Sequence, residues 1–584
     1  MKKFISFNVG RASLLIALMA FIMVSPQLFF HSIMVGDDMP FHFNRIYDLY
    51  QQMKTGNLNY FQSIYGFNQS GRIINALYGY DLSFFLAGLL MIVKTWTRFQ
   101  IVSSFICFFL SGLNMYILLK YAKVSERLSV ILSFLYMSCS LISFYAVIQS
   151  FISWGGAFLP LIFIPAIKAV RDKKNPINPV YLAIPVSLLI SSHILTAVIG
   201  IMAIIPFFLV SFYNCRKKIK WIVNGLLSVL LTLIISANSL YGYFEVFTTN
   251  NLLKPYINTN MSNSTVMLSL GNNETRNLGL IFSTLFVVHL IYTFSIWQKL
   301  PLLEKIINFT GGLFLVISSN LVPWNDMANK LTFLTTFQFP LRFSIVSYIL
   351  LLAGIGLGLN RFNENANKEK KKIVQMILIT CSVFSIANVN NLMKEHSNYW
   401  MSSNPAQGGN NTPNVFVTDP NQFRSMIKDK DLSKALNVIK KGTPDYLALS
   451  KNESTESIYK KEPYKIYEHD VIENPNNVKK SVTYDSKLKL EWNSENSEEV
   501  ILPVAIYGNS TIKMNGQNKS PNEVGKSDLG LLEVNSLVGN NTVIVGYTPM
   551  INMKLIITIK VFGLIFCCIN LVNYFSFKRY RKKT

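Results

Sequence analysis

The chain has 584 residues, of which 50% are hydrophobic and only 15% are charged. An ordinary soluble protein carries about 25% charged residues, so this composition excludes the soluble globular class and indicates a chain that spans a membrane many times. The formal net charge is +24. In a soluble protein that charge would suggest a nucleic-acid partner. Here the lysines and arginines flank hydrophobic stretches, as cytoplasmic loops of membrane proteins do, so we expect no nucleic-acid partner.

About thirteen hydrophobic stretches follow one another along the chain, and the first is expected to remain as an anchor instead of being cleaved. The N-terminus and the tail Lys578–Lys583 are both basic, which predicts cytoplasmic termini and an even number of crossings. One stretch must therefore be re-entrant or half-spanning, or two must merge. The weakest is 82–97, which is short and broken by Lys94. The stretches are 12–31, 82–97, 100–119, 128–148, 155–170, 179–193, 195–213, 221–239, 278–297, 307–323, 342–360, 373–390 and 553–577.

Charge also assigns the connecting loops to the two sides of the membrane. Loops rich in lysine and arginine are held in the cytoplasm, and the others then face outside. The loops predicted to be cytoplasmic are 120–127, 171–178, 214–220, 298–306 and 361–372. The loops predicted to face outside are 32–81, 149–154, 240–277 and 324–341.

The composition changes at residues 391–552, which are polar and predict an extracytoplasmic α+β domain that is β-rich in its second half. We expect a helix near 421–441, a β-sandwich-like sheet, and turns at Asn515-Gly516 and at 539–541. The expected strands are 482–492, 499–507 and 542–547. The predicted fold is mainly α: a polytopic helical bundle over 1–390 with a first outer loop at 32–81, the domain at 391–552, and a final transmembrane helix with a basic tail at 553–584.

The densest group of chemically useful side chains follows the first hydrophobic stretch. Asp37, Asp38, His42 and Arg45 stand there within ten residues. The spacing of apolar residues predicts a helix over 39–54 that lies on the membrane surface, with Pro40 in its first turn. Asp37 or Asp38 also suits the cap of that helix, so capping competes with a functional role.

Arginines on the same side of the membrane complete the candidate set. Arg72 lies in the first outer loop, and Arg342 follows Gln338 at the outer end of a span. A carboxylate can act as a general base or hold a divalent metal, and arginine can bind a phosphate, so the pattern suggests transfer from a phosphate-linked donor. Solvated interfacial charges would give the same pattern. His193, between two apolar stretches, favours a packing role at least as much as a functional one.

Two of these stretches resemble a known family. Gly36-Asp37-Asp38-x-x-Phe41-His42-x-x-Arg45 is similar to the first outer loop of polytopic GT-C type glycosyltransferases. The nearest resemblance is to the bacterial membrane family labelled 6-pyruvoyl-tetrahydropterin synthase-related, with the YfhO-like proteins as cousins. Gln338-Phe339-Pro340-x-Arg342-Phe343 and the β-rich ending before a last span also resemble that group. The zinc chemistry in the family's label does not transfer, because the six histidines are scattered.

The resemblance implies an inverting sugar transfer on the outer face of a bacterial cell membrane. The donor would be a polyprenyl-phosphate-linked sugar, and the acceptor a cell-wall polymer or a glycolipid. Asp38 would be the catalytic base, and Asp37 its partner or a ligand of a divalent metal, Mg²⁺ or Mn²⁺. Substrate-binding roles would fall to His42, Arg45, Arg72, Gln338 and Arg342. The family also leads us to expect an acidic residue in the loop before the fifth span, where this chain has Trp154-Gly155-Gly156.

Two other functions fit the same composition. A transporter or flippase of lipid-linked sugars would carry charges midway through its spans and would show matched halves. A non-catalytic protein of cell-envelope assembly would depend on its outer domain and not on Asp37 and Asp38.

Overall fold

The computed structural model describes residues 8–268, 277–406, 415–417, 419–439 and 442–580. Within these residues it contains eight helices that are long and apolar enough to cross a membrane, so the chain is a multi-pass membrane protein that is mainly α. Two further helices, α6 (Glu126–Met137) and α7 (Ser140–Ile148), pass the same test together but are bent by 46° at their junction. The eight are α2 (Asn8–Phe29), α5 (Trp96–Tyr121), the continuous stretch Ile152–Arg171 with α8 (Ile152–Phe158) and α9 (Phe163–Arg171), α11 (Ile194–Asn214), α12 (Lys218–Ile235), the stretch Pro340–Glu364 with most of α17 (Ser344–Asn365), α18 (Lys368–Met401) and α23 (Met553–Tyr580).

Every predicted hydrophobic stretch is helical, but several are shorter than a full span. The stretch 82–97 is divided at Lys94, which has a left-handed φ of 65° and ends one helix just before Trp96 begins the next. A left-handed residue ends a helix because its main chain cannot continue the α conformation. The shorter helices are α4 (Tyr80–Val93), α10 (Pro179–Ser192), α14 (Gly279–Ser295) and α15 (Leu302–Ser318).

The five basic loops meet at one end of the bundle, which we call the basic end. Arg171 donates hydrogen bonds to the carbonyl oxygens of Tyr121 and Ala122, and the main-chain nitrogen of Arg216 donates to Lys173. Arg361 forms an ion pair with Glu304. Asn360, beside Arg361, donates to the carbonyl oxygen of Lys123, and this bond joins the last two basic loops to the others. The five loops therefore lie on one side of the membrane-spanning region.

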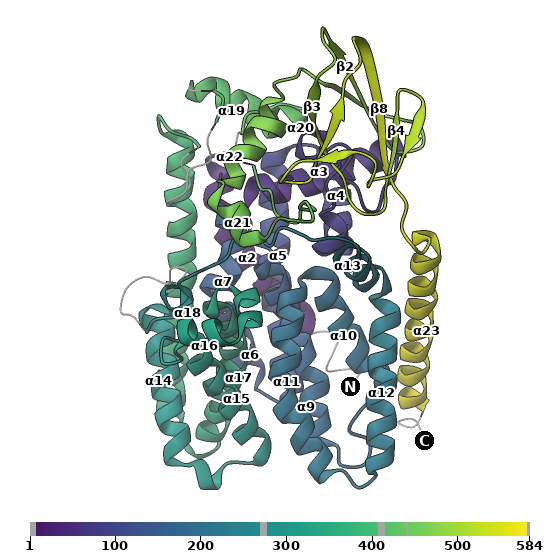
Figure 1. The fold of residues 1–584 in the computed structure, drawn as a ribbon. Coiled ribbons are helices and arrows are strands. Elements are labelled where there is room, and N and C mark those ends of the chain that lie inside the picture. Colours follow the sequence, from purple (N-terminus) through teal and green to yellow (C-terminus); the bar gives the residue numbers. More distant parts are fainter. Residues whose placement is uncertain (1–7, 269–276, 407–414, 418, 440–441, 581–584) are drawn as a thin grey trace.

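The opposite end, the domain end, carries the polar C-terminal residues (Figure 1). Helix α3 (Met39–Thr55) lies there, as the sequence predicts, but it is not a surface helix, because its side chains are buried along most of its length. Leu432 and Leu436 share its apolar core. The expected helix over 421–441 is two short helices. The other helices at this end are α13 (Ala237–Thr249), α16 (Trp324–Lys330), α19 (Pro420–Lys428), α20 (Leu432–Asn437), α21 (Thr455–Lys460) and α22 (Pro463–Tyr467).

The C-terminal strands form two antiparallel sheets that enclose one core, which confirms the expected sandwich. The larger sheet has the order β1-β2-β8-β4-β5 and the smaller β3-β7-β6. The turn at Asn515-Gly516 joins β4 to β5, as predicted, whereas 539–541 is not a turn but the start of β8. The strands are β1 (Lys479–Val482), β2 (Leu488–Ser494), β3 (Glu499–Ala505), β4 (Ser510–Met514), β5 (Gln517–Lys519), β6 (Gly525–Lys526), β7 (Leu531–Asn535) and β8 (Gly539–Tyr547).

A buried carboxylate attaches the sandwich to the bundle. Glu245 of α13 is fully buried and accepts hydrogen bonds from Tyr241, Asn509 and Tyr547 and from the main-chain nitrogen of Met550. A buried carboxylate needs such donors, because without them the loss of hydration would be uncompensated.

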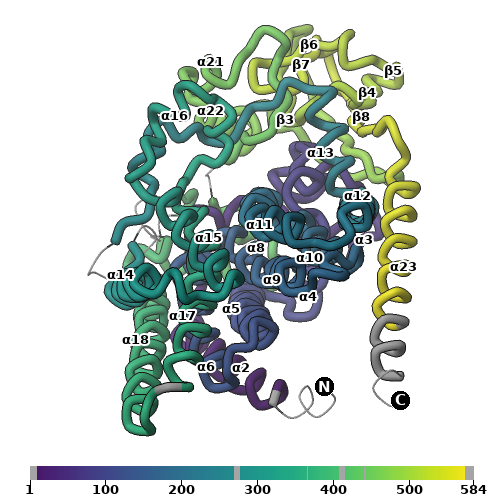
Figure 2. Tube along the Cα trace, turned by 90° about the horizontal axis from the view of Figure 1, so that it is seen from below, coloured from purple at the N-terminus to yellow at the C-terminus, as the bar shows by residue number. Residues whose placement is uncertain are grey.

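Helix α23 stands at the edge of the bundle beside α12 in both views (Figures 1 and 2). Lys560 attaches it to the bundle through an ion pair of 2.5 Å with Asp81 and a hydrogen bond of 3.1 Å to Asn238. A groove of about 900 Å³ with mainly aliphatic and aromatic walls lies between α10, α12 and α23. A bilayer would fill this groove with hydrocarbon, so it provides contact with lipid and no reactive group.

Candidate functional site

The Asp37-Asp38 pair stands where the last turn of α7 touches the start of α3. Gly36 permits this contact, because a Cβ atom there would lie 2.3 Å from Cα of Ile148. The main-chain nitrogen of Asp38 donates to the carbonyl oxygen of Ile148 over 3.2 Å. Asp38 occupies the N-cap position of α3, which is one of the two expected alternatives, but its side chain accepts no hydrogen bond from the first turn of the helix. Both residues are half-buried, and neither is without an interaction in the protein.

His42 and Arg45 lie one turn further along α3 and contact each other. His42 is 2% exposed and stacks on Phe151 with 3.9 Å between the ring centroids. Its Nδ1 accepts a hydrogen bond of 2.9 Å from Nη1 of Arg45, so the neutral ring carries its proton on Nε2. Burial, and then the charges of Arg45 and His193, hold the pKa of His42 well below its usual value. His42 is therefore a neutral hydrogen-bonding group and not a cation for a phosphate.

The protein itself uses all three nitrogens of the fully buried Arg45 guanidinium. Besides His42, it donates to Oδ1 of Asn75, to the carbonyl oxygen of Tyr78 and to Oγ of Ser83. Tyr78 also lies against the guanidinium face, 4.7 Å from ring centroid to Cζ. Burial lowers the pKa of Arg45 to about 10, so it stays charged at neutral pH. We assign Arg45 the role of fixing the surrounding segments, because the side chain is fully buried and each of its three nitrogens already donates within the protein.

Arg342 differs from Arg45 in this respect. Among the described residues, only Nη1 of its guanidinium donates hydrogen bonds. The acceptors are the carbonyl oxygen of Phe337 at 3.2 Å and Oε1 of Gln338 at 3.1 Å. Gln338 is held by its own bonds, from Nε2 to the carbonyl oxygen of Tyr256 and from Asn258 to its carbonyl oxygen. Gln338 thus orients Arg342, and Nε and Nη2 of that guanidinium remain as donors for a ligand.

Asp38 and Arg342 belong to one cluster. They lie close enough for their charges to interact with each other and with Tyr78, although they are far apart in sequence. Burial, and then Asp38, raises the pKa of Tyr78. His193 caps α11 by accepting from the main-chain nitrogen of Thr196, and it faces the Tyr78 ring. Burial, with Arg342 and Arg45 nearby, lowers the pKa of His193 to about 3, so this second histidine is also neutral.

Arg72 is expected to bind substrate, but its guanidinium binds main-chain oxygens of the protein instead. It is fully buried, and it donates from Nη1 and Nη2 to the carbonyl oxygens of Thr443 and Asp445. We call the segment Thr443–Tyr446 the strap. Arg72 positions this strap instead of meeting a phosphate, and the strap carries Asp445 to within electrostatic reach of Asp38.

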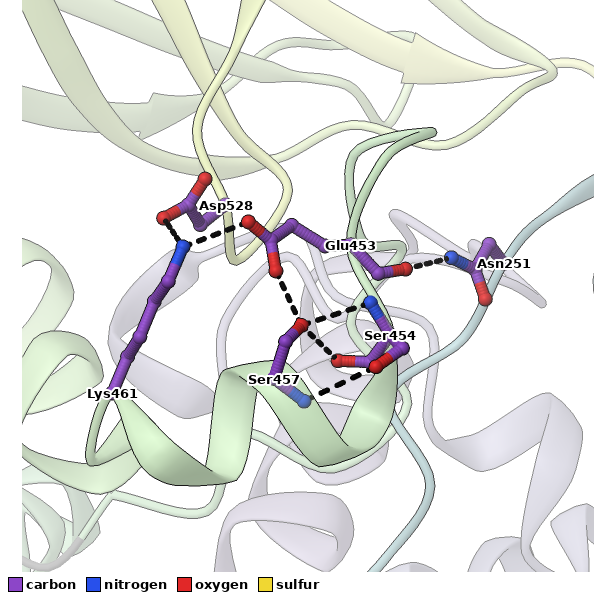
Figure 3. Close-up of polar contacts among 6 residues, drawn as sticks. All are labelled: Asn251, Glu453, Ser454, Ser457, Lys461 and Asp528. Carbon is purple, nitrogen blue, oxygen red and sulfur yellow. Dashed lines mark hydrogen bonds and ion pairs between the residues drawn. The ribbon is translucent and has the colours of Figure 1, made fainter.

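The chain after the strap is fastened on two sides (Figure 3). Nδ2 of Asn251, in the loop after α13, donates to the carbonyl oxygen of Glu453 over 2.8 Å. Lys461 bridges the carboxylates of Glu453 and Asp528 at 2.7 and 2.8 Å. Since Asn251 follows a helix of the bundle and Asp528 belongs to the sandwich, the chain that follows the strap is anchored between these two parts.

The site therefore brings together Asp38, His42, Arg45 and Arg342 with Gln338 behind them, and it places Arg72 behind the strap. Sequence reasoning gave no role to Tyr78, Asp445 or Tyr446 and only a weak one to His193. The signal for Asp445 is slight, since Thr443-Pro444-Asp445 is an ordinary turn sequence in a polar region. Only its contact with Arg72 distinguishes it from the surface carboxylates.

No three histidine, cysteine, aspartate or glutamate side chains gather as metal ligands in the described ranges of the chain. The small hollow between α3 and the strap, lined by Pro40, Asn44, Phe67 and Thr443 among others, measures about 20 Å³ and has room for one water molecule. Compared with known proteins, the chain matches no protein family and no curated protein.

Proposed function

We propose that the protein is a GT-C-like membrane glycosyltransferase. It transfers a sugar from a polyprenyl-phosphate carrier to a cell-envelope polymer or glycolipid on the outer face of a bacterial membrane. One observation carries the proposal: a half-buried carboxylate, Asp38, lies within electrostatic range of Arg342, whose guanidinium retains hydrogen-bond donors. Transfer from a phosphate-linked donor requires such a pair: a base that accepts the proton of the acceptor hydroxyl, and a cation with unused hydrogen-bond donors that binds the phosphate.

The meeting of the five basic loops supports an orientation. The positive-inside rule assigns a basic loop cluster to the cytoplasm, and the domain end, with Asp38 and residues 442–552, then faces outside. In this orientation Arg342, in the first turn of its span, lies near the depth at which the phosphate of a membrane-anchored donor lies.

The proposed reaction is one displacement with inversion. Arg342 holds the donor phosphate by Nε and Nη2. An acceptor hydroxyl transfers its proton to the Asp38 carboxylate as its oxygen forms a bond to the anomeric carbon. The bond from that carbon to the phosphate oxygen breaks, and its electron pair leaves with polyprenyl phosphate. Arg342 stabilises the negative charge that develops on the leaving oxygen.

The neighbouring residues position these two groups. His42 and Arg45 hold the first turns of α3, which bear Asp38, against Tyr78, and Gln338 orients Arg342. Asp37 would be the protein ligand of a divalent cation in this proposal. Mg²⁺ often takes one or two protein carboxylates and completes its shell with phosphate and water, so a cluster of three protein ligands is not needed.

The location of these charges favours transfer over transport. Asp38, His42 and Arg45 precede the span α5 and follow the span α2, and Arg342 stands at a helix start. A transporter would use charged groups near the middle of its spans.

The test uses membrane vesicles that contain the full chain and a polyprenyl-phosphate hexose radiolabelled in its sugar. Label should pass from the lipid to the polymer or glycolipid fraction with the wild-type protein and not with Asp38→Asn. If both proteins transferred the label equally, Asp38 would not be the catalytic base. Label that crossed the vesicle membrane while still attached to its lipid would favour transport.

A further inference from the structure

The Asp445 side chain of the strap is a second carboxylate that needs an explanation. Its Oδ1 is buried and has no hydrogen-bond partner within the described residues. Buried carboxylate oxygens are nearly always hydrogen-bonded, because the loss of hydration costs free energy that only a donor recovers. A buried carboxylate oxygen without a donor therefore indicates either a bound ligand or a structural role such as stored strain.

The strap is built to hold Asp445 in this position. Arg72 fixes it from one side through two main-chain oxygens. Tyr446 adopts a left-handed φ of 63°, which is unfavourable for a tyrosine. Its nitrogen donates to Leu253 over 2.9 Å, and its carbonyl oxygen accepts from the Tyr507 hydroxyl over 3.2 Å. The surrounding structure thus maintains a strained turn immediately after Asp445.

This turn lies within electrostatic range of both Asp38 and Arg342. Asp445 interacts electrostatically with Asp38, and the adjacent Tyr446 interacts with Arg342. Tyr446 and Tyr78 both pack on the apolar group formed by Phe41, Phe67 and Ile74. In an inverting transfer the acceptor and the leaving phosphate lie on opposite sides of the sugar, so the ring being transferred occupies the interval between Asp38 and Arg342.

A sugar hydroxyl is the ligand that suits Asp445. A carboxylate accepts hydrogen bonds and donates none, so it repels the donor phosphate and attracts hydroxyl groups. Burial raises the pKa of Asp445 to about 6, with Arg72 opposing and Asp38 adding to the rise, so the side chain is ionised at neutral pH. The nearby tyrosines, Tyr78 and Tyr446, supply aromatic surface of the kind that lines ligand sites.

We propose that the strap completes the site and that Asp445 binds a hydroxyl group of the sugar that is transferred. This inference rests on the proposed function, because it takes the sugar of a lipid-phosphate donor as its ligand. It adds a residue from the C-terminal part of the chain to a site whose other groups come from the helical bundle.

The test measures binding to the full chain in lipid nanodiscs, with Asp38→Asn present so that no sugar is transferred. The two probes are a polyprenyl-phosphate hexose and the same polyprenyl phosphate without sugar. Asp445→Asn should weaken binding of the first probe about 10- to 100-fold, the effect of losing a hydrogen bond to a charged group, and leave the second within about twofold. Asp485→Asn, an exposed carboxylate of the sandwich whose partners among the described residues are its neighbours Lys487 and Thr483, is the matched control and should change neither.

The inference would be wrong if Asp445→Asn weakened the binding of both probes equally or of neither probe. It would also be wrong if the preference for the sugar-bearing probe disappeared when Mg²⁺ is removed. If the Asp445→Asn chain fails to fold, carbodiimide labelling of Asp445 in the otherwise intact chain decides the question. The sugar-bearing probe should protect Asp445, and protection by both probes or by neither would contradict the proposal. A chain that binds sugar through Asp445 but transfers none would disprove the proposed function alone, whereas transfer insensitive to Asp445→Asn would disprove this inference alone.

Discussion

Nη1 of Arg45 donates a hydrogen bond of 2.9 Å to Nδ1 of His42, and this contact fixes both side chains. The same guanidinium reaches Asn75, Tyr78 and Ser83, so it joins α3 to the loop before α4 and to α4 itself. Arg45→Lys should therefore lower the stability of the chain by about 2 kcal/mol or more, because one ammonium group cannot reach these four acceptors.

Thermal unfolding of the purified chain in detergent measures the effect of Arg45→Lys. Lys54→Ala, at the exposed end of the same helix, is the control and should leave the unfolding temperature unchanged. An Arg45→Lys chain as stable as the wild type would show that this network does not hold α3 in place.

Arg342→Gln should raise the KM for the lipid-phosphate donor about 10- to 100-fold, because it removes a charge-assisted contact to phosphate. Because Arg342 also stabilises the charge that develops on the leaving oxygen, kcat should fall as well. The matched control is Arg98→Gln, an exposed arginine that should leave KM unaltered. An unchanged KM in the Arg342 variant would mean that the donor phosphate binds elsewhere.

Arg72→Met should loosen the strap without removing any group that contacts substrate. Methionine fills much of the same space but donates no hydrogen bond to Thr443 or Asp445. Hydrogen–deuterium exchange should rise in a peptide spanning the strap and remain as it was in β2 and β8. If exchange in the strap peptide is unaltered, Tyr446 and its partners alone are sufficient to hold the strap.

Donor binding should depend on pH through Asp445. A protonated carboxyl group is a poorer acceptor, and the raised pKa of this side chain is about 6. Affinity for the sugar-bearing donor should therefore increase as the pH rises from about 5 to 7, and Asp445→Asn should abolish that increase. Asp38 and Arg72 face the same carboxyl group, so the titration is measured again with Asp38→Asn, which removes one of the two charges. A pH dependence that survived in Asp445→Asn would have to come from another group.

The sequence is sufficient to predict the helices, because hydrophobic length and flanking charge are local properties of the chain. It also predicts α3, since Pro40 and the spacing of apolar residues are local. The burial of α3 is not predictable in this way. Leu432 and Leu436, which cover it, lie almost 400 residues further along the chain.

The same limit applies to the site. Asp38 and Arg342 are recognisable from short stretches of sequence, but the difference between Arg342 and Arg45 depends on which acceptors surround each guanidinium. Arg72 meets main-chain oxygens of a segment that carries no distinctive sequence. Asp445 is placed by that contact and by the bonds of Tyr446 to Leu253 and Tyr507, all distant in sequence, so no local pattern could have singled it out.

The most direct test of the central claim is the effect of Asp38→Asn on transfer and on donor binding, measured on the same protein. As a general base, Asp38 should contribute about 10²- to 10⁴-fold to kcat and little to donor affinity. Asp326→Asn, an exposed carboxylate at the same end of the bundle, serves as the control. The account predicts that Asp38→Asn reduces kcat by at least about 100-fold while the Kd for the polyprenyl-phosphate sugar stays within about threefold. A variant that transferred sugar at the wild-type rate would contradict it.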